Sequence, residues 1–469
     1  MKILRTIAAF TLPLTLLAYL DIAQVHPHDF WWHVKTGEII AQTGSVPQTE
    51  LFSYARAGQR WVNEPWLMQL ALYLLYKTGG MALVIFTHAL LVTGGYTLVW
   101  SQARKRFGHA AAAVATLLGA LIGMLNWSVR PQGASFLFFG ATVALIEIDR
   151  EKKGRSLWPL VPIFALWVNC HGGFTFGLLA LGTYAACRVA LDRAELRRLA
   201  PIVLAALVAC CLTPVGPRGI VEHVGAFFES GATGPSNLEF EPLTIRMVDG
   251  MFFFYAVGRL VYPLLRGRPL PKLDEAIPLL VFAIAALAIA RAAPWFGMML
   301  VPVLARSLAP EPDAEKAPPS PRAPVIGALL VAAVVITLPF FRAKLPIPPA
   351  LRSYVSDDTP IASTKWVCDN VPKDERLFSV QAHTSYVEWA CPRVGVLVDT
   401  RIQAFSGETW NDYFAVANAR YDWEDILAKY NVRYVMLPIE QKTTIKAVSS
   451  SPRWKELHRD DTAVVFGAQ

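Results

Sequence analysis

The sequence predicts an α-helical polytopic membrane protein of about eleven transmembrane helices, followed by a C-terminal α/β domain. Apolar residues make up 54% of the 469 residues and charged residues only 17%, a composition typical of a chain embedded in lipid. The apolar residues fall in blocks close to the length that spans a bilayer. After the last block, residues 342–469 change to short strand-like and helical segments, which indicates a separate soluble domain.

The apolar blocks predict the membrane spans. They lie at residues 6–24, 81–102, 110–127, 132–148, 157–170, 173–190, 200–214, 248–265, 275–291, 294–309 and 323–341. Lys2 and Arg5 precede the first block, as in a signal peptide, but Asp21-Ile22-Ala23 is a poor cleavage site. We therefore expect a retained first span with its N-terminus in the cytoplasm.

Charge alternates from loop to loop. Basic clusters lie at residues 104–106, 149–155, 193–198, 266–272 and 306–322, the last within a Pro-rich linker expected to be unstructured. The intervening loops are 25–79, 126–132, 169–174, 212–247 and 291–296. Because basic loops stay in the cytoplasm, we expect the second set on the outer face. The net charge of +8 then reflects orientation, and we expect no nucleic-acid binding.

The chain thus divides into a transmembrane domain, residues 1–341, with a long first outer loop at 25–79, and a C-terminal domain, residues 342–469, on the outer face. In the latter, residues 377–380, 394–398 and 432–437 read as buried strands, 423–430 as a helix, and 454–458 with 463–466 as a hairpin. Cys368 and Cys391 both fall in this domain, where oxidising conditions permit a disulfide. Sequence leaves their pairing open.

The first outer loop opens with His26-Pro27-His28-Asp29-Phe30-Trp31-Trp32-His33, directly before a segment, 30–42, that reads as a helix. Asp29 is placed either to cap that helix or to take a proton from an attacking hydroxyl. His33, one turn on, would orient Asp29, bind substrate or simply be solvated. The tryptophans suit a membrane interface, which predicts a helix lying on the outer leaflet.

A metal site is a further reading of this loop. His26 and His28 could join Asp29 and Glu64 around a divalent metal, although their spacing is irregular. The six cysteines form no metal-binding pattern.

Three arginines stand at outer ends of spans: Arg130, Arg218 and Arg291. An arginine near hydrocarbon either reaches lipid headgroups or meets an anion, and three converging guanidinium groups would suit a phosphate. His171, before Gly172-Gly173, adds a donor where the backbone can approach a ligand. Weaker candidates for a pocket wall are Glu222, His223, Glu239 and Glu241.

At these residues the chain resembles the GT-C superfamily of membrane glycosyltransferases, and more narrowly a group of uncharacterised bacterial GT-C-like proteins. The stretches that carry the resemblance are Asp29-Phe30-Trp31-Trp32-His33 with Gly37, Phe52-Ser53-Tyr54, residues 61–67, Arg130-Pro131-Gln132, residues 169–174 and Val398-Asp399-Thr400-Arg401. The resemblance covers most of the chain.

The resemblance implies a transferase at the outer face of a bacterial inner membrane. It would move a sugar from a polyprenyl-phosphate donor to a glycan, lipid or protein acceptor, with inversion, and Asp29 matches the family's first-loop acid. Glu64 and His33, with Arg130, His171, Arg218 and Arg291, would contact substrate. Many members carry two acids in this loop, whereas His28 precedes Asp29 and Phe30-Trp31 follow it. This departure favours a metal-independent base and leaves a divalent metal open.

Two rival functions remain open at this point. A lipid-linked glycan transporter would also need arginines at the membrane, but transporters usually bind substrate near the midplane between repeated halves, and no repeat is apparent. An assembly or binding protein could keep the fold without catalysis.

Overall fold

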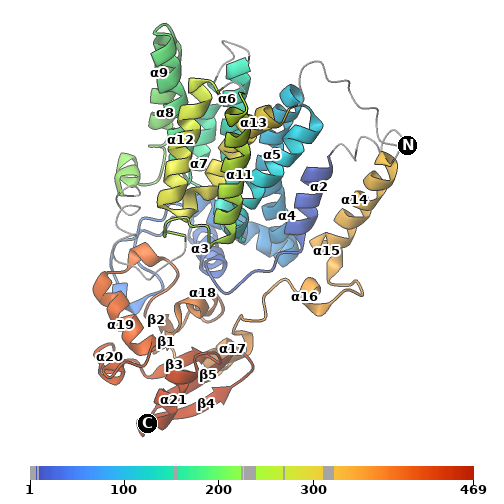
Figure 1. Ribbon diagram of the computed structural model, residues 1–469. Coiled ribbons are helices and arrows are strands. Elements are labelled where there is room, and N and C mark those ends of the chain that lie inside the picture. Colours follow the sequence, from blue (N-terminus) through green and yellow to red (C-terminus); the bar gives the residue numbers. More distant parts are fainter. Residues whose placement is uncertain are drawn as a thin grey trace. The chain divides into compact units, whose positions relative to one another are not determined.

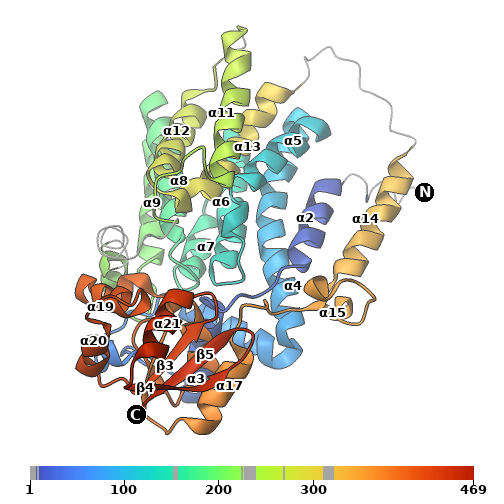
Figure 2. The same cartoon turned by 60° about the horizontal axis from the view of Figure 1, so that its bottom comes forward.

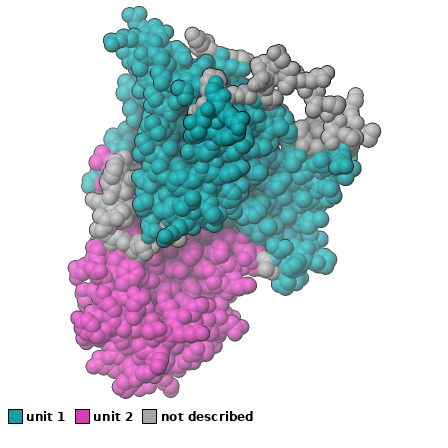
Figure 3. Space-filling model, viewed as in Figure 1, with its two compact units in different colours: residues 1–23, 79–220, 237–352 teal, residues 24–78, 221–236, 353–469 magenta. Residues whose placement is uncertain are grey.

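The computed structural model describes residues 7, 10–151, 157–222, 225, 239–267, 270–309 and 322–469. Several sequence-based predictions lie outside these residues: Lys2 and Arg5, His223, residues 152–155 of the second basic cluster, and the Pro-rich part of the linker at 310–321. Contacts divide the chain into two compact units (Figure 3). Unit 1 comprises residues 1–23, 79–220 and 237–352, and unit 2 comprises 24–78, 221–236 and 353–469. The predicted boundary at 341/342 falls within unit 1, and the loop 25–79 lies almost wholly in unit 2.

Unit 1 is built of helices (Figure 1). These are α2 (Thr11–Asp21), α5 (His109–Leu121), η2 (Met124–Asn126), α6 (Gln132–Glu151), α7 (Leu160–Trp167), α8 (Phe174–Leu191), α9 (Glu195–Ala209), α11 (Val248–Leu265), α12 (Leu273–Ala288), η3 (Ala290–Ala292), α13 (Ala293–Leu308), α14 (Ala323–Thr337), α15 (Pro339–Arg342) and α16 (Pro349–Arg352). Helix α4 (Trp66–Phe107) belongs to both units and is broken at Gly80, whose φ of 62° and ψ of −162° suit glycine alone. The boundary between the units falls beside this break.

Each predicted span overlaps one of these helices. Within the described residues, α4, α6 and α8 are long and apolar enough to cross a membrane, and α5 and α14 are shorter apolar helices. Helices α5 and α13 cross at two glycines, where a Cβ on Gly119 would lie 2.4 Å from the Gly297 carbonyl oxygen. Small residues at a helix crossing are typical of packing in lipid. The number of spans stays a prediction.

The predicted basic loops meet at one end of unit 1. Arg106 pairs with Glu147 and Arg306 with Glu275. Arg150 Nε lies 3.3 Å from Asp274, and Arg198 lies 2.6 Å from Asp149. These ion pairs join the ends of α4, α6, α9, α12 and α13, so the alternate loops that the charge pattern groups together do lie on the same side of the bundle.

Unit 2 contains a five-stranded mixed sheet of order β2-β1-β3-β5-β4 (Figure 1). Figure 2 shows three of these strands, β3, β5 and β4, from a second side. Its strands are β1 (Arg376–Ser379), β2 (Gly395–Val396), β3 (Tyr434–Pro438), β4 (Trp454–Arg459) and β5 (Ala463–Ala468). Strand β1 pairs in parallel with β2 and β3, whereas β3, β5 and β4 pair antiparallel. The α/β character, the three buried strands and the final hairpin predicted from the sequence are confirmed.

Helices cover both faces of this sheet. The helices of unit 2 are α3 (Phe30–Thr43), η1 (Tyr54–Arg56), the first part of α4, α17 (Ile361–Asn370), α18 (Gln381–Ala390), η4 (Ile402–Ala404), α19 (Gly407–Ala417), α20 (Trp423–Lys429) and α21 (Lys442–Ser450). Residues alternate between faces along each strand: in β3, Met436 packs with α17 and α18, whereas Val435 and Leu437 pack with α19, α20 and α21.

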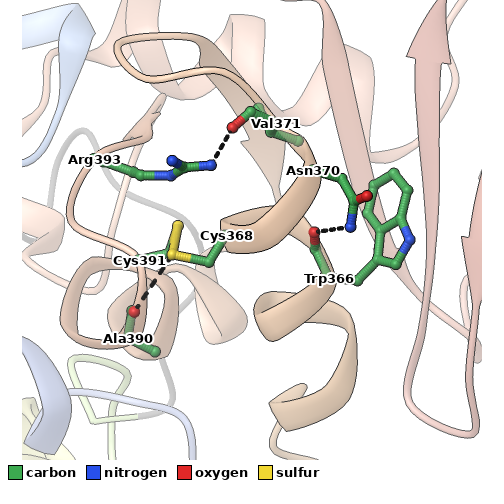
Figure 4. The surroundings of a disulfide bond; sticks show 7 residues. All are labelled: Trp366, Cys368, Asn370, Val371, Ala390, Cys391 and Arg393. Carbon is green, nitrogen blue, oxygen red and sulfur yellow. Dashed lines mark hydrogen bonds between the residues drawn. A yellow bond between two sulfur atoms is a disulfide. The ribbon is translucent and has the colours of Figure 1, made fainter.

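Cys368 in α17 and Cys391 after α18 form a disulfide (Figure 4). Beside it, the Arg393 guanidinium donates to the Val371 carbonyl oxygen at 2.5 Å. The structure thus contains the disulfide that the sequence permits but does not establish. Such a bond persists in oxidising compartments.

We expect the double substitution Cys368→Ala/Cys391→Ala to destabilise unit 2 by about 3 kcal/mol, because the bond closes a loop of 23 residues. Thermal unfolding of the purified protein in detergent measures the change, and reductant should lower the melting temperature of the wild type but not of the double variant. Cys211→Ala, which removes a free thiol, is the control. An unchanged melting temperature on reduction would contradict this expectation.

Candidate catalytic site

Asp29 lies in unit 2 directly before α3, which begins at Phe30 and ends at Thr43, one residue beyond the predicted helix at 30–42. Its φ and ψ of −54° and −33° are helical, and its side chain makes no capping hydrogen bond to the described first turn. A capping aspartate normally has extended dihedrals and accepts a backbone N–H two or three residues on. The reading of this half-buried carboxylate as a helix cap is therefore wrong.

His33, one turn after Asp29, belongs to a buried chain of amides. The Asn63 side chain donates to Gln69 Oε1 at 2.7 Å, which leaves the Gln69 amide nitrogen to donate to His33 Nδ1 at 3.2 Å. Nδ1 is thus an acceptor, and the ring proton lies on Nε2. Gly37 allows this approach, since a Cβ there would lie 2.1 Å from the Gln69 carbonyl oxygen.

The tryptophans of this loop are buried in unit 2. Trp31 packs against Tyr386 and Trp389 of α18, with ring centroids 4.9 and 4.7 Å away. Trp32 donates its indole N–H to Thr400 and its backbone N–H to Ser385, at 3.0 and 3.1 Å. The prediction that these rings make α3 a helix on the lipid surface is therefore wrong: they attach α3 to the C-terminal fold.

A buried ionic group centred on Arg401 lies beside these rings. Arg401 Nε lies 3.0 Å from both oxygens of Asp399, and its terminal nitrogen donates to Glu50 at 2.7 Å. Glu50 also accepts the backbone N–H groups of Phe52 and Ser53. The guanidinium faces Trp61 at 4.8 Å, with Phe52 and Trp32 at 5.4 and 5.6 Å. The motifs around Phe52, Trp61 and Asp399 are thus parts of one cluster, the Arg401 group.

Glu388 of α18 is a third carboxyl at the Arg401 group, and nothing in the sequence pattern singles it out. It is 2% exposed. Burial, followed by the negative charge of Asp399, raises its pKa well above the usual value, against the opposing charge of Arg401. Burial would also raise the pKa of Glu50, but the charge of Arg401 and hydrogen bonds from Arg401, Phe52 and Ser53 outweigh it and lower that pKa.

A raised pKa in the folded state means that unfolding releases a proton. The contribution of Glu388 to stability is fully present below its unfolded pKa of about 4.5 and falls as pH rises toward the folded pKa, by up to about 1.4 kcal/mol per pH unit. Glutamine has the shape of the protonated acid but does not titrate. We therefore expect the free energy of unfolding of Glu388→Gln to fall less than that of the wild type between pH 5 and pH 9. Melting temperatures of both proteins across this range measure the difference, and parallel pH profiles would contradict it.

In unit 1, Glu239 brings together two of the three predicted arginines. Arg130 pairs with one carboxylate oxygen of Glu239, and Arg291 NH1 lies 3.9 Å from the other. The Arg291 backbone also donates to the Glu239 carbonyl oxygen at 2.7 Å. Two guanidinium groups face one carboxylate, so these three charges sum to one positive charge.

His171, also in unit 1, is held by a second hydrogen-bonded chain. The Trp167 indole N–H donates to Ser135 Oγ at 2.7 Å, and the Ser135 hydroxyl lies 2.8 Å from His171 Nδ1. The Gly173 N–H also donates to Nδ1, at 3.0 Å. Nδ1 is therefore an acceptor, and Nε2–H is the donor that His171 can offer to a ligand.

The other predicted site residues lie in separate segments of the chain. Glu64 is half-buried in the turn before α4, and Arg218 is exposed in a helical segment that begins at residue 217. Glu222 lies 3.5 Å from Arg60. Asp29, His33 and Glu64 belong to unit 2, whereas Arg130, His171, Arg218 and Arg291 belong to unit 1.

His26 and His28 are engaged with each other and with Asp358. Their rings stack at 5.9 Å, and His26 Nδ1 lies 3.5 Å from Asp358. Within the described ranges, no group of three or more His, Cys, Asp or Glu side chains is arranged to hold a metal ion.

Comparison with solved structures places this geometry in a known fold. The oligosaccharyltransferase AglB from Archaeoglobus fulgidus, in complex with an inhibitory peptide and a dolichol-phosphate, is similar with a TM-score of 0.60 and 15% identity, over 97% of this chain and 74% of AglB. ArnT from Cupriavidus metallidurans, bound to undecaprenyl phosphate, gives a TM-score of 0.56 and 16% identity over 99% of this chain and 97% of ArnT. The chain has a GT-C fold.

The mycobacterial arabinofuranosyltransferase AftD shares the GT-C fold too, with a TM-score of 0.58 and 15% identity over the whole of this chain and 40% of AftD. No family model matches the sequence, and no curated protein matches it. The GT-C resemblance inferred from short motifs is thus borne out at the level of the fold.

Proposed function

We propose that the protein is a membrane glycosyltransferase that uses a polyprenyl-phosphate sugar as donor and inverts the anomeric carbon. The observation that carries the proposal is the similarity of nearly the whole chain to ArnT with bound undecaprenyl phosphate and to AglB with a bound dolichol-phosphate. The acceptor is a glycan, lipid or protein hydroxyl. The reaction takes place at the outer face of a bacterial inner membrane.

Asp29 acts as the general base in this proposal. It takes the proton of the acceptor hydroxyl while the hydroxyl oxygen attacks the anomeric carbon and the bond from that carbon to the phosphate oxygen breaks. The lipid phosphate leaves with the bonding electrons. In support, the Asp29 carboxylate does not cap α3, and α3 is held to Ser385 of α18 and to Thr400 through Trp32 and to Gln69 through His33.

The phosphate binds the positively charged group formed by Arg130 and Arg291 around Glu239, with Arg218 and the Nε2–H of His171 as further contacts. A guanidinium presents a planar pair of donors to phosphate oxygens. Because the phosphate is already a competent leaving group, this cationic stabilisation replaces a general acid. Glu64 contacts the acceptor, and no metal is required.

Two independent features support the topology of this proposal. The basic helix ends of unit 1 meet on one side, which we assign to the cytoplasm with the N-terminus. The disulfide between Cys368 and Cys391 suits an oxidising compartment, so the domain at 342–469, like the loop 25–79, is periplasmic. The transmembrane domain is residues 1–341.

The direct test is incubation of the purified protein in detergent with a panel of polyprenyl phosphates that carry different sugars. Release of free polyprenyl phosphate, by transfer to an added acceptor or by slow hydrolysis, is the expected result. Absence of release from every donor of a broad panel, by protein shown to be folded, would contradict the proposal.

A further inference from the structure

Four buried polar side chains of unit 1, which the proposed mechanism does not use, gather around the η2 turn. They are His88 of α4, Asn126 of η2, Gln132 at the start of α6 and Asp249 in the first turn of α11. Their exposures are 3%, 5%, 1% and 3%. We call them the η2 cluster.

Contacts with three consecutive residues, Leu125 to Trp127, connect the cluster. His88 Nε2 donates to the Trp127 carbonyl oxygen at 3.0 Å, and Asp249 accepts the backbone N–H of Leu125. Asn126 lies between these two residues. Gln132 precedes Gly133, where a Cβ would lie only 2.5 Å from His88 Nδ1, so the glycine admits the imidazole to the start of α6.

Each member has an unused hydrogen-bonding atom. Within the described part of the chain, no partner exists for His88 Nδ1, Asn126 Oδ1, Asp249 Oδ1 or either polar atom of the Gln132 amide. A buried polar group left unpaired destabilises the folded state. Apolar side chains of the same size would avoid this cost, so packing alone does not account for these residues.

The chemistry of the unused atoms defines a matching ligand. Because Nε2 of His88 donates to a carbonyl, its Nδ1 is an acceptor, and the Asn126 and Asp249 oxygens are acceptors as well. Gln132 alone offers both an acceptor and a donor. The ligand must therefore present several donors close together, together with at least one acceptor. A polyol does so, whereas a phosphate, which offers acceptors, does not.

The cluster also lies near the arginine to which we assign the phosphate. Arg130 is two residues from Gln132, and its charge acts on His88. In a sugar phosphate the ring is joined directly to the phosphate, so a site for ring hydroxyls must lie beside the phosphate site.

We propose that His88, Asn126, Gln132 and Asp249 bind the hydroxyl groups of the donor sugar. This inference rests on the proposed function, because it takes the sugar to be carried by a lipid phosphate. It assigns sugar recognition to the junction of α4, η2, α6 and α11.

The test compares two probes: polyprenyl phosphate, and polyprenyl phosphate carrying glucose, mannose or arabinose. Titration calorimetry of the full-length protein in detergent should give a lower Kd for at least one sugar-bearing lipid than for the bare lipid. Gln132→Met keeps the side-chain volume but removes both polar atoms. It should weaken binding of that sugar-bearing lipid about 10-fold and leave the Kd of the bare lipid unchanged.

The matched control is Thr142→Val. Thr142 is also buried in α6, but its hydroxyl already donates to the Phe138 carbonyl oxygen. It should bind both probes as the wild type does. Gln132→Met should melt no lower than the wild type, because it removes an unpaired amide, so misfolding does not obscure the result.

Two outcomes would overturn the inference: no sugar-bearing lipid binds more tightly than the bare lipid, or Gln132→Met keeps the full preference. The second would mean that the cluster holds ordered water only. Asp29→Asn separates this result from the proposed function, since it should retain the binding preference while losing transfer. Transfer by that variant would contradict the role of Asp29 and leave the binding result standing.

Discussion

Asp29→Asn should lower the rate of sugar transfer at least about 100-fold, the minimum expected when a general base is lost. The amide keeps the size of the carboxylate but cannot accept the proton of the attacking hydroxyl. Because the Asp29 side chain makes no capping hydrogen bond to α3, the same substitution should not incur the loss of stability that follows removal of a helix cap. A helix cap would behave in the opposite way, with a loss of about 1 kcal/mol in stability.

The control for this substitution lies on the same helix. Glu38 of α3 is a half-buried carboxylate that pairs with Lys35 at 2.8 Å, and Glu38→Gln should retain transfer. The measurement is the initial rate of product formation with the donor that the wild type prefers, at saturating donor and acceptor. Full activity in Asp29→Asn would remove Asp29 as the base.

The sequence was sufficient for the elements of the fold because their signals are local. Apolar blocks mark the helices of unit 1, and short apolar runs mark β1, β2 and β3. The alternation of basic loops carried longer-range information, since Arg106, Arg150, Arg198 and Arg306 do meet at one end through ion pairs.

Partners distant in sequence could not be predicted in this way. Glu50 and Arg401 are 351 residues apart and Trp32 and Thr400 are 368 apart, and no periodicity relates such positions. Tryptophan occurs both at membrane interfaces and in protein cores where its indole N–H is hydrogen-bonded. For this reason the sequence predicts Trp31 and Trp32 at the lipid surface. In the structure they instead attach α3 to α18.

The candidate site also combines features that local sequence predicts with features that depend on the fold. Proximity of Asp29 and His33 follows from helical spacing, but the amide chain through Gln69 and Asn63 depends on the fold. The sequence predicts Arg130 and Arg291 one at a time, each from its own position at the end of a span. Their junction through Glu239, and the role of Gln132 in the η2 cluster, depend on how four helix ends assemble.

Arg401→Met should destabilise unit 2 by about 3–5 kcal/mol, because it leaves buried carboxylates without their counter-ion. Arg401 forms direct ion pairs with both Asp399 and Glu50. Arg401→Lys restores the charge but not the paired donors or the flat face that packs on Trp61. It should therefore recover only part of the loss. Thermal or urea unfolding in detergent measures these differences.

The effect should depend on the carboxylates and not on the lost side chain as such. Asp399→Asn in the Arg401→Met background removes one of the unpaired charges, so the double variant should be more stable than the sum of the two single losses predicts. Arg433→Met is the control, since Arg433 is 66% exposed and lies 3.7 Å from Glu375, and it should cost less than about 1 kcal/mol. Additive losses in the double variant would show instead that Arg401 stabilises unit 2 mainly by packing among Trp32, Phe52 and Trp61, and that its ion pairs with Asp399 and Glu50 add little.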